Sequence, residues 1–157
     1  MIRVRGFRRD DAAALEHDFL RAVREGAAGA YSELEREAWA NAPHSAAYWC
    51  DRLGAEITLV AERGSVISGF MTLCRDATLD MAFVLPEAMG TGVANALHDR
   101  VIVEAQALGM TRLTTEASHL ARRFFLKQGW RELGAQKIEL SGLLLTNFAM
   151  EKRLAHL

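Results

Sequence analysis

The stretch from Leu79 to Leu97 constrains the fold of this chain more than any other. It starts as an apolar run that stops at Pro86 and continues through a turn that holds Gly90 and Gly92. Beyond the turn, apolar residues recur every three or four positions, as on one face of a helix: Val93, Leu97, Val101, Ala105 and Leu108. The stretch therefore predicts a short strand, a glycine turn and a helix, in this order.

The glycine turn predicts a site for a phosphate or pyrophosphate. Gly90 and Gly92 let a ligand approach the backbone, and the first N–H groups of the helix have no intrahelical partner. A P-loop would need Lys-Ser/Thr after the second glycine, and none follows. A dinucleotide fingerprint would need Gly or Ala where Asn95 stands, and four residues separate Leu85 from Gly90. Both of these classes are poor matches.

Two motifs are similar to those of the GCN5-related N-acetyltransferases, the GNAT family. The loop from Met89 to Ala94 follows that family's acetyl-CoA pattern Gln/Arg-x-x-Gly-x-Gly/Ala, with Met in the place of Gln/Arg. The block from Ser118 to Trp130 follows Asn/Ser-x-x-Ala-x-x-Phe/Leu-Tyr-x-x-x-Gly-Phe, with Phe125 in the place of Tyr and Trp130 in the place of Phe. The resemblance is good between Val66 and Leu154 and loose before them.

Composition and charge argue against several other classes. With 157 residues, half of them hydrophobic, the chain suits one buried core, and we expect a single domain over residues 1–157. A net charge of −1 gives no reason to expect nucleic acid or a membrane surface as a partner. No apolar run is long enough to span a bilayer, and the N-terminus lacks a signal-peptide core. Cys50 and Cys74 show no metal spacing, so we expect buried thiols in a cytoplasmic protein without a metal.

Alternating and helical patterns divide the chain into seven strands and five helices. The expected strands are residues 2–7, 56–62, 66–74, 79–85, 111–117, 130–140 and 143–150. The expected helices begin at Asp10 or Asp11, Ser32, Ser45, Gly92 and Ser118; Asn41-Ala42-Pro43 breaks the second, and Gly109 ends the fourth. This order predicts an α/β fold with one mixed sheet and helices on both faces. The resemblance implies a mostly antiparallel sheet of about seven strands, splayed between strands four and five.

The resemblance also implies acetyl-CoA as a co-substrate and assigns its contacts. Backbone N–H groups of the loop would hold the pyrophosphate, and the fourth strand would pair with the pantetheine arm and polarise the thioester carbonyl. Ser118 would meet the CoA arm from the opposite side or serve only as a helix cap. Phe124 is equally a core residue. The expected cofactor residues are Phe83, Val84, Leu85, Met89, Gly90, Thr91, Gly92, Val93, Ala94, Asn95, Ser118, Phe124 and Phe125.

The residue that would protonate the departing CoA sulfur stays open. Many family members have Tyr where this chain has Phe125, which carries no proton to give. CoA thiolate leaves tolerably without help, because a thiol has an unperturbed pKa of about 8.5. Water or Tyr31 could supply the proton, and packing at a helix start is the alternative role of Tyr31.

The base that takes the proton of the amine also stays open. Asp80 and Glu116 are the candidates, a surface ion pair is the alternative for each, and a water chain could replace both. Alternation along the strand would place Asp80 on one face with Ala82 and Val84. Histidines are weaker candidates, and we expect most of them at the surface: His44, His98 and His119.

In this family the first two helices and the last hairpin usually recognise the acceptor amine. Aromatic residues concentrate in the first of these regions and are more often core than substrate contacts: Tyr31, Trp39, Tyr48 and Trp49. Trp39 is our candidate for a cationic amine, with Tyr31 and Glu116 as further substrate contacts. The acceptor could be a small amine, an amino acid, an antibiotic or a protein N-terminus. The protein could also form a homodimer.

The resemblance predicts an acetyl-CoA-dependent N-acetyltransferase in which a primary amine attacks directly within a ternary complex. A catalytically silent acyl-CoA-binding or regulatory module on the same fold is the alternative, which the departures at Met89 and Phe125 keep open. A protein that binds another phosphate ligand is a third reading. The block from Ser118 to Trp130 argues against it, because a simple phosphate site does not need that spacing.

Overall fold

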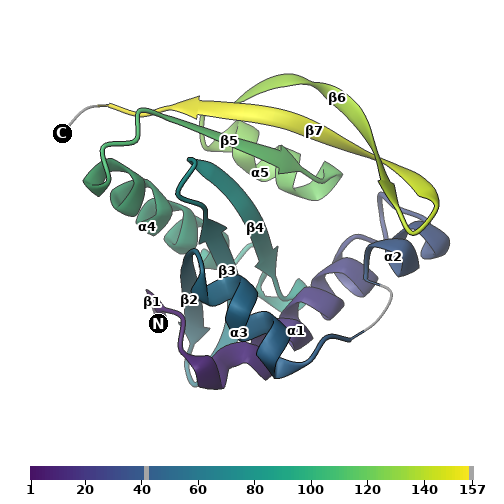
Figure 1. The fold of residues 1–157 in the computed structure, drawn as a ribbon, viewed down its shortest axis with the longest axis horizontal. Helices are drawn as coiled ribbons and strands as arrows, with labels where there is room; N and C mark the ends of the chain where they lie inside the picture. Colours follow the sequence, from purple (N-terminus) through teal and green to yellow (C-terminus); the bar gives the residue numbers. More distant parts are fainter. Residues whose placement is uncertain (41–42, 156–157) are drawn as a thin grey trace.

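The computed structural model describes residues 1–40 and 43–155 and contains one seven-stranded sheet (Figure 1). The strands follow the order β1-β2-β3-β4-β5-β7-β6 and comprise β1 (Ile2–Gly6), β2 (Ile57–Arg63), β3 (Val66–Leu73), β4 (Thr78–Val84), β5 (Arg112–Ala117), β6 (Arg131–Leu140) and β7 (Leu143–Arg153). The helices are α1 (Ala12–Arg21), α2 (Glu33–Trp39), α3 (Ala46–Gly54), α4 (Val93–Ala107) and α5 (His119–Lys127). Two short 3-10 helices, η1 (Arg9–Asp11) and η3 (Pro86–Ala88), and one π-helix, η2 (Ala22–Gly26), accompany them. Of the predicted break at 41–43, Asn41 and Ala42 lie outside the described residues.

The sheet is antiparallel except where β4 meets β5. These two strands run parallel and pair only at Thr78↔Thr114 and Leu79↔Thr115, after which they diverge. By contrast, β5 and β7 stay paired from Arg112 to Ala117. The predicted mixed sheet with a splay between strands four and five is therefore confirmed.

Two apolar layers hold helices against the two faces of the sheet. On one face, α4 and α5 pack on residues of β2, β3 and β5, with Met71, Leu97 and Phe125 among the buried members. On the other face, α1 and α3 pack on β2, β3 and β4 around Leu15, Trp49 and Phe70. Each face has buried side chains because neighbouring strand residues point in opposite directions.

The apolar stripe of α4 is confirmed for four of its five predicted residues. Val93, Leu97, Val101 and Ala105 are fully buried, whereas Leu108 is 49% exposed. The helix ends at Ala107, and the chain turns away at Gly109, where φ is +75°. Leu108 therefore lies beyond the last helical residue, and the periodicity no longer points it at the sheet.

Serine caps begin three of the helices, as predicted. The hydroxyl oxygens of Ser32, Ser45 and Ser118 each accept a hydrogen bond from a backbone N–H of the first turn. Glu35 completes the capping box of α2 by accepting from the Ser32 N–H at 2.8 Å. These caps satisfy backbone donors that the helices cannot pair internally.

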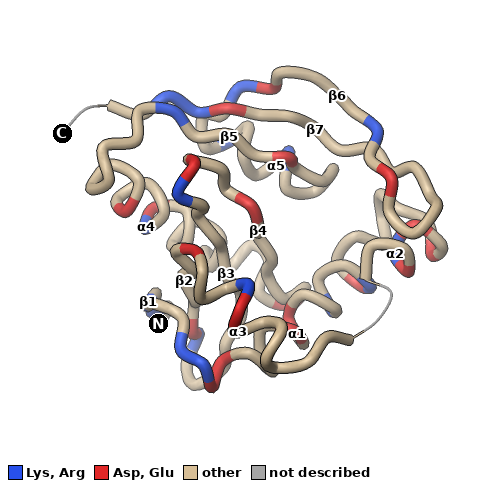
Figure 2. The backbone as a smooth tube through the Cα atoms, in the orientation of Figure 1, with Lys and Arg blue, Asp and Glu red and all other residues tan. Residues whose placement is uncertain are grey.

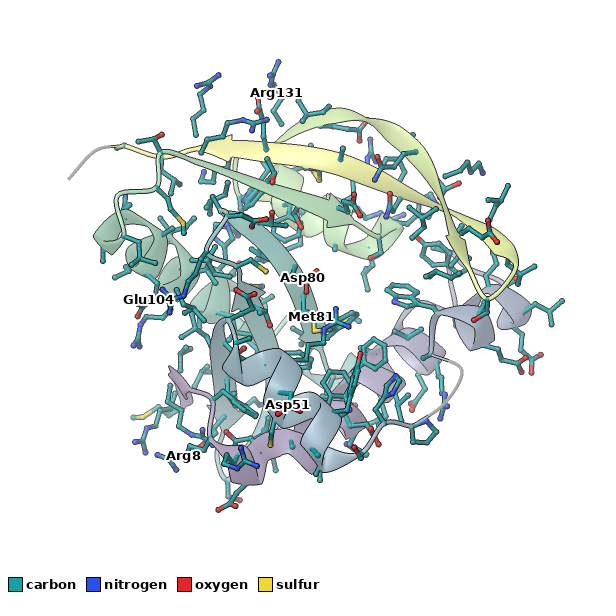
Figure 3. The ribbon with its side chains drawn as sticks, in the orientation of Figure 1. Arg8, Asp51, Asp80, Met81, Glu104 and Arg131 are labelled. Carbon is teal, nitrogen blue, oxygen red and sulfur yellow. The ribbon has the colours of Figure 1, made fainter. Side chains whose placement is uncertain are left out.

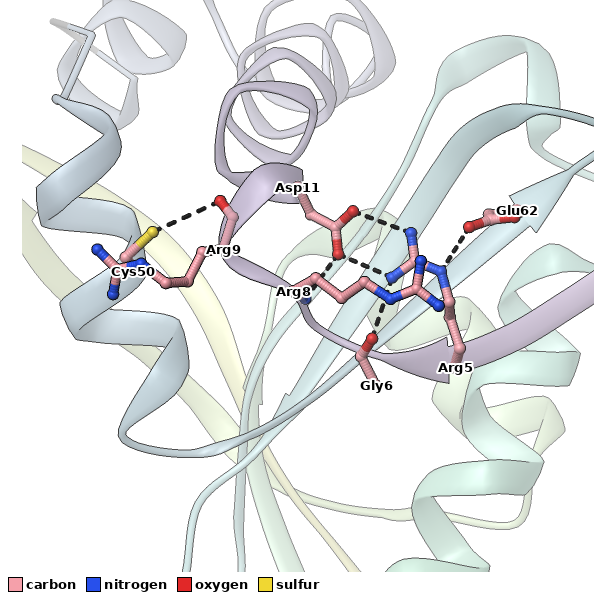
Figure 4. Close-up of polar contacts among 7 residues, drawn as sticks. All are labelled: Arg5, Gly6, Arg8, Arg9, Asp11, Cys50 and Glu62. Carbon is pink, nitrogen blue, oxygen red and sulfur yellow. Dashed lines mark hydrogen bonds and ion pairs between the residues drawn. The ribbon is translucent and has the colours of Figure 1, made fainter.

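Asp11 does not cap α1 with its side chain. Its carboxylate instead accepts from the Arg8 N–H at 2.7 Å and from both terminal nitrogens of Arg5 at 2.8 and 2.9 Å (Figure 4). Arg5 also pairs with Glu62, so this cluster ties β1 and β2 to the start of the first helix. Burial alone would raise the pKa of Asp11, but the hydrogen bonds from Arg5 and Arg8 outweigh it and hold that pKa below its usual value.

The two cysteines are unpaired thiols. Cys50 is buried, as expected, whereas Cys74 is only half-buried. Burial next to several carboxylates raises the pKa of the Cys74 thiol to about 12. In residues 1–40 and 43–155, no helix combines the length and apolarity that a membrane crossing requires, and no group of His, Cys, Asp or Glu is placed to hold a metal.

Replacing Asp11 tests whether its cluster stabilises the fold. Asp11→Asn removes the charge from a buried pair and is expected to lower the free energy of unfolding by about 1–3 kcal/mol at pH 7. Because the pKa of Asp11 is lowered in the folded state, this contribution is present above the usual Asp pKa and is lost as the pH falls below it. Urea denaturation at pH 7 measures the loss of stability in the variant, and denaturation at about pH 3 measures how much of that difference disappears in acid. Asp10→Asn, at the exposed neighbouring position, is the control, and an equal effect of both variants would contradict the prediction.

Candidate active site

A glycine loop joins β4 to α4 and forms one wall of a cavity. Gly90 and Gly92 adopt φ of +72° and +93°, and Gly92 is the N-cap of α4. Left-handed backbone of this kind suits glycine, which has no Cβ to clash. Gly90 and Gly92 line the cavity together with Ala94 and Asn95 from the first turn of α4.

This cavity, here called the donor cavity, has a volume of about 530 Å³ and is lined by β4, the glycine loop and α5. Most of the predicted cofactor residues line it: Phe83, Val84, Met89, Gly90, Gly92, Ala94, Asn95, Ser118, Phe124 and Phe125. Three others do not. Leu85 and Val93 are buried in the core, and the hydroxyl of Thr91 donates to the Ala88 carbonyl.

The donor cavity also has residues that the sequence reading missed. Arg123 and Lys127 line it from α5 and bring positive charge, as a ligand with phosphates would require. Their spacing of four residues puts them on one face of the helix, a signal that was available in the sequence. Met89 packs closely against Gly26 of η2. A side chain at position 26 would not fit there without a shift, because its Cβ would lie only 3.0 Å from the Met89 methyl carbon.

A second cavity lies on the other side of the splay. It has a volume of about 640 Å³ and is here called the acceptor cavity. Aromatic side chains from the first helices and β4 line it, together with two carboxylates: Phe19, Tyr31, Trp39, Tyr48, Trp49, Phe83, Asp80 and Glu116. The two cavities meet, because six residues line both of them: Trp39, Ala82, Phe83, Ser118, Ala121 and Phe125.

Asp80 does not share a face with Ala82 and Val84, so that prediction is wrong. Thr72 pairs with Met81 and Leu73 with Leu79, which leaves Asp80 as the extra residue of a β-bulge. The bulge turns Asp80 towards α3, where its Oδ2 accepts from Arg52 Nη2 at 3.3 Å. Figure 3 shows Asp80 beside Met81 on β4. Alternation of side chains fails at a bulge, and only the register of two strands reveals one.

Glu116 is an exposed carboxylate at the point where the strands part. It is the residue after Thr115, the last β5 position that pairs with β4. Its side chain makes neither a hydrogen bond nor an ion pair with any residue the structure describes. Of the two candidate bases, only Asp80 is engaged by a cation.

Tyr31 lines the acceptor cavity but uses its hydroxyl to hold the fold together. The hydroxyl donates to the Thr146 carbonyl oxygen at 2.7 Å and accepts from the His119 N–H at 3.2 Å. The ring packs against Trp39, with centroids 5.5 Å apart. Burial raises the pKa of Tyr31, and the hydrogen bond from His119 offsets only part of that rise. These contacts favour the packing role over that of a proton donor.

His98 is buried, contrary to the expected surface position. Its Nε2 accepts from the Trp130 ring N–H at 2.9 Å, and it is only 2% exposed. Burial, with the charge of Lys152, lowers the pKa of His98 to about 4, so the ring is neutral at pH 7. His44 is exposed and stacks on Tyr48. The helical position of His98 carried no signal that Trp130 would meet it.

Phe125 occupies the position where many GNAT proteins have Tyr. It is 1% exposed, packs against Trp130 with centroids 4.8 Å apart, and lines both cavities. Ser118 also lines both cavities, and its hydroxyl oxygen accepts from the Ala121 N–H at 3.2 Å, which is the cap role. The wall shared by the two cavities is therefore mostly apolar.

A sheet that opens between two adjoining cavities, one of them bounded by a glycine loop, suits an enzyme that transfers a group from a large donor to a separate acceptor. Comparisons with known proteins agree. A family model for the acetyltransferase (GNAT) domain matches residues 27–152. The uncharacterized N-acetyltransferase YafP of Escherichia coli (strain K12) is 32% identical over 155 residues, which cover 99% of this chain and 98% of that protein. The chain therefore belongs to the GNAT acetyltransferase family.

Solved structures share this fold over nearly the whole chain. A Rhodopseudomonas palustris protein, described as a GCN5-related N-acetyltransferase and as a class-II aminotransferase, has a TM-score of 0.92 and 33% identity, with 97% of this chain and 95% of that one covered. YncA of Salmonella typhimurium, a putative acetyltransferase solved with its cofactor acetyl-CoA, has a TM-score of 0.69 and 20% identity, with 99% and 95% covered. The predicted family and enzyme class, acetyltransferase, are confirmed.

A Tyr31→Phe variant separates packing from proton transfer. Loss of the hydrogen bond to Thr146 is expected to lower the free energy of unfolding by about 1–2 kcal/mol. Any acetyl transfer is expected to persist within about threefold, because the proton of Tyr31 is already engaged. Urea denaturation and release of the CoA thiol measure the two effects. Ser45→Ala, which removes another hydroxyl hydrogen bond at a helix start but lines neither cavity, is the control. A hundredfold loss of rate with unchanged stability would make Tyr31 a catalytic acid.

Proposed function

We propose that this protein is an acetyl-CoA-dependent N-acetyltransferase, which moves an acetyl group to a primary amine by direct attack in a ternary complex. The observation that carries the proposal is the junction of the donor and acceptor cavities at the splay between β4 and β5. A thioester held in one cavity and an amine held in the other would meet there without crossing the core. Proximity of this kind lowers the barrier by replacing a collision with a bound geometry.

The donor cavity suits acetyl-CoA in shape and charge. Backbone N–H groups from Met89 to Asn95 would hold the pyrophosphate, with Arg123 and Lys127 near its other phosphates. The pantetheine arm would add to the free edge of β4 at Phe83 and Val84, where β5 no longer supplies partners. The predicted contact at Leu85 is not available, because its N–H donates to the Ser68 carbonyl and its carbonyl accepts from the Ala88 N–H. The fold shared with YncA, which was solved with acetyl-CoA, supports this placement. No metal enters the proposal.

The reaction would proceed by attack of the neutral amine on the thioester carbonyl carbon. Glu116 would take the ammonium proton, directly or through water, because none of the described residues pairs with its side chain, whereas Asp80 is paired with Arg52. A backbone N–H of β4 would stabilise the developing oxyanion. The carbon–sulfur bond would then break to release CoA thiolate, which water can protonate in place of the missing Tyr hydroxyl at Phe125.

The apolar substitution at Phe125 also supports the second candidate, a silent acyl-CoA-binding module. The two functions differ in a single measurable step, which is release of the CoA thiol in the presence of an amine. A homodimer stays a prediction. Leu133 and Leu144 on the β6–β7 hairpin are 48% and 62% exposed and would be available for such a contact.

Calorimetric titration with acetyl-CoA, run beside a Gly92→Glu variant, tests the proposal. The new carboxylate would lie among the amides that hold the pyrophosphate, and its repulsion is expected to weaken binding by roughly a hundredfold. Gly142→Glu is the matched control, because Gly142 also has a positive φ, of +82°, but lines neither cavity. It carries the same backbone strain and should bind normally.

The outcomes are distinct. Binding by the parent, loss in Gly92→Glu only, and amine-dependent release of CoA would support the transferase. The same binding pattern without CoA release for any of a broad set of amines would favour the silent module. A folded parent that does not bind acetyl-CoA would contradict both.

A further inference from the structure

The acceptor cavity is lined by both positive and negative side chains. Arg52, from the last turn of α3, is the only Lys or Arg among the described residues that line it. Two carboxylates, Asp80 and Glu116, lie at the points where β4 and β5 part. Figure 2 shows that the segments around α3, β4 and β5 carry charges of both signs. A ligand that matches this wall carries both a positive and a negative group.

Arg52 has donors to spare for an anionic group. Its Nη1 donates to the Tyr48 hydroxyl oxygen at 3.0 Å, and its Nη2 donates to Asp80 at 3.3 Å. Arg52 and Asp80 therefore share one hydrogen bond and not the two of a bidentate pair. A guanidinium offers five N–H groups in a planar fork, so most of them remain free. The side chain is 43% exposed, which leaves it open to a ligand from the cavity. A carboxylate is the group whose geometry matches this fork.

The opposite wall is suited to an amine. Glu116 on β5 pairs with Ala149 on β7, so Asn147, two residues along β7, is a diagonal neighbour on the same face. Asn147 lines the cavity and is 7% exposed, and its side-chain oxygen has no partner among the described residues. A buried acceptor without a donor is unfavourable, and an incoming N–H group would satisfy it. An ammonium can bond to Glu116 and to Asn147 at once, because it has three N–H groups.

We propose that the acceptor is a small molecule that carries both a primary amine and a carboxylate, of the amino-acid class. Its amine lies between Glu116 and Asn147, near the junction of the two cavities, and its carboxylate is bound by Arg52. The aromatic wall of Trp39 and Phe83 accommodates an apolar side chain between the two charged ends. This inference rests on the proposed function and deepens it by naming the class of acceptor.

The chemistry balances with these residues in their places. The ammonium first loses one proton to Glu116 or water, and the neutral nitrogen then forms a bond to the acetyl carbonyl carbon. The carbon–sulfur bond breaks, and the second proton that the nitrogen loses passes through water to the CoA thiolate. The acceptor carboxylate is unchanged, so the product is an N-acetyl amino acid and CoA thiol. The product nitrogen no longer carries a positive charge, and its attraction to Glu116 is lost, which favours release.

Matched pairs of acceptors test this inference. The probes are the common amino acids, each beside the amine that lacks its α-carboxylate, for example phenylalanine with 2-phenylethylamine and leucine with isopentylamine. The rate of CoA-thiol release gives kcat/KM for each. The kcat/KM of the best amino acid is expected to be at least about tenfold higher than that of its carboxylate-free partner, which is the effect of one charge-assisted contact. The difference is expected to lie in KM.

Arg52→Gln is expected to reverse that preference. Loss of the guanidinium removes the carboxylate partner, so KM for the amino acid rises by at least about tenfold. The same loss leaves Asp80 without its cation and makes the acceptor cavity more negative, so the carboxylate-free amine is bound more tightly than by the parent. A general structural defect would weaken both acceptors together. Arg63→Gln, at an exposed position that lines neither cavity, is the control and should change neither value.

The inference would be overturned if the parent prefers the carboxylate-free amines, or if Arg52→Gln lowers kcat/KM equally for both kinds of acceptor. Neither result would contradict the proposed transferase function. Acetyl-CoA binding without thiol release for any acceptor in the panel would overturn the transferase and this inference with it. A preference for the amino acid that reverses in Arg52→Gln supports the inference.

Discussion

The early parting of β4 from β5 is the constraint on which the rest of this structure depends. Two parallel pairs hold these strands together, and beyond Leu79 and Thr115 each strand presents an unpaired edge. Exposed strand edges readily take an added extended chain. The gap therefore gives an extended ligand backbone groups to pair with, and it connects the two faces of the sheet.

The remaining elements keep the gap open and shape its two sides. On one side the glycine loop and α5 form the donor cavity, and on the other the first helices and β7 form the acceptor cavity. Tyr31 links the helical region to both β7 and α5 through its two backbone hydrogen bonds. The ion pair of Arg21 with Glu87 ties α1 to the turn before the glycine loop. These contacts join the helical wall of the acceptor cavity to β7, to α5 and to the turn before the glycine loop.

Local signals in the sequence predicted much of this fold. The glycines before α4, the serine caps and the apolar stripe of α4 each depend on a few neighbouring residues, and the structure confirms them apart from Leu108. The family motifs supplied the splay, which no local pattern shows. That one domain spans residues 1–157 stays a prediction.

The acceptor side was less predictable, because its geometry arises from contacts between distant segments. The bulge at Asp80 depends on the register with β3, and the burial of His98 depends on Trp130. Asn147 lines the cavity because β7 pairs with β5, and this pairing cannot be read from the residues around Asn147. The position of Glu116 at the end of its strand made it a candidate base, but no local pattern showed that Asp80 would be paired and Glu116 without a partner among the described residues.

A crystal structure of the protein with acetyl-CoA tests the central claim most directly. The account predicts the pyrophosphate on the backbone N–H groups between Gly90 and Asn95, and the pantetheine arm extended along β4 in the splay. The thioester would lie beside Ala82 and Phe83, where the two cavities join. Acetyl-CoA bound elsewhere, or a gap between β4 and β5 that stays closed to it, would contradict the account.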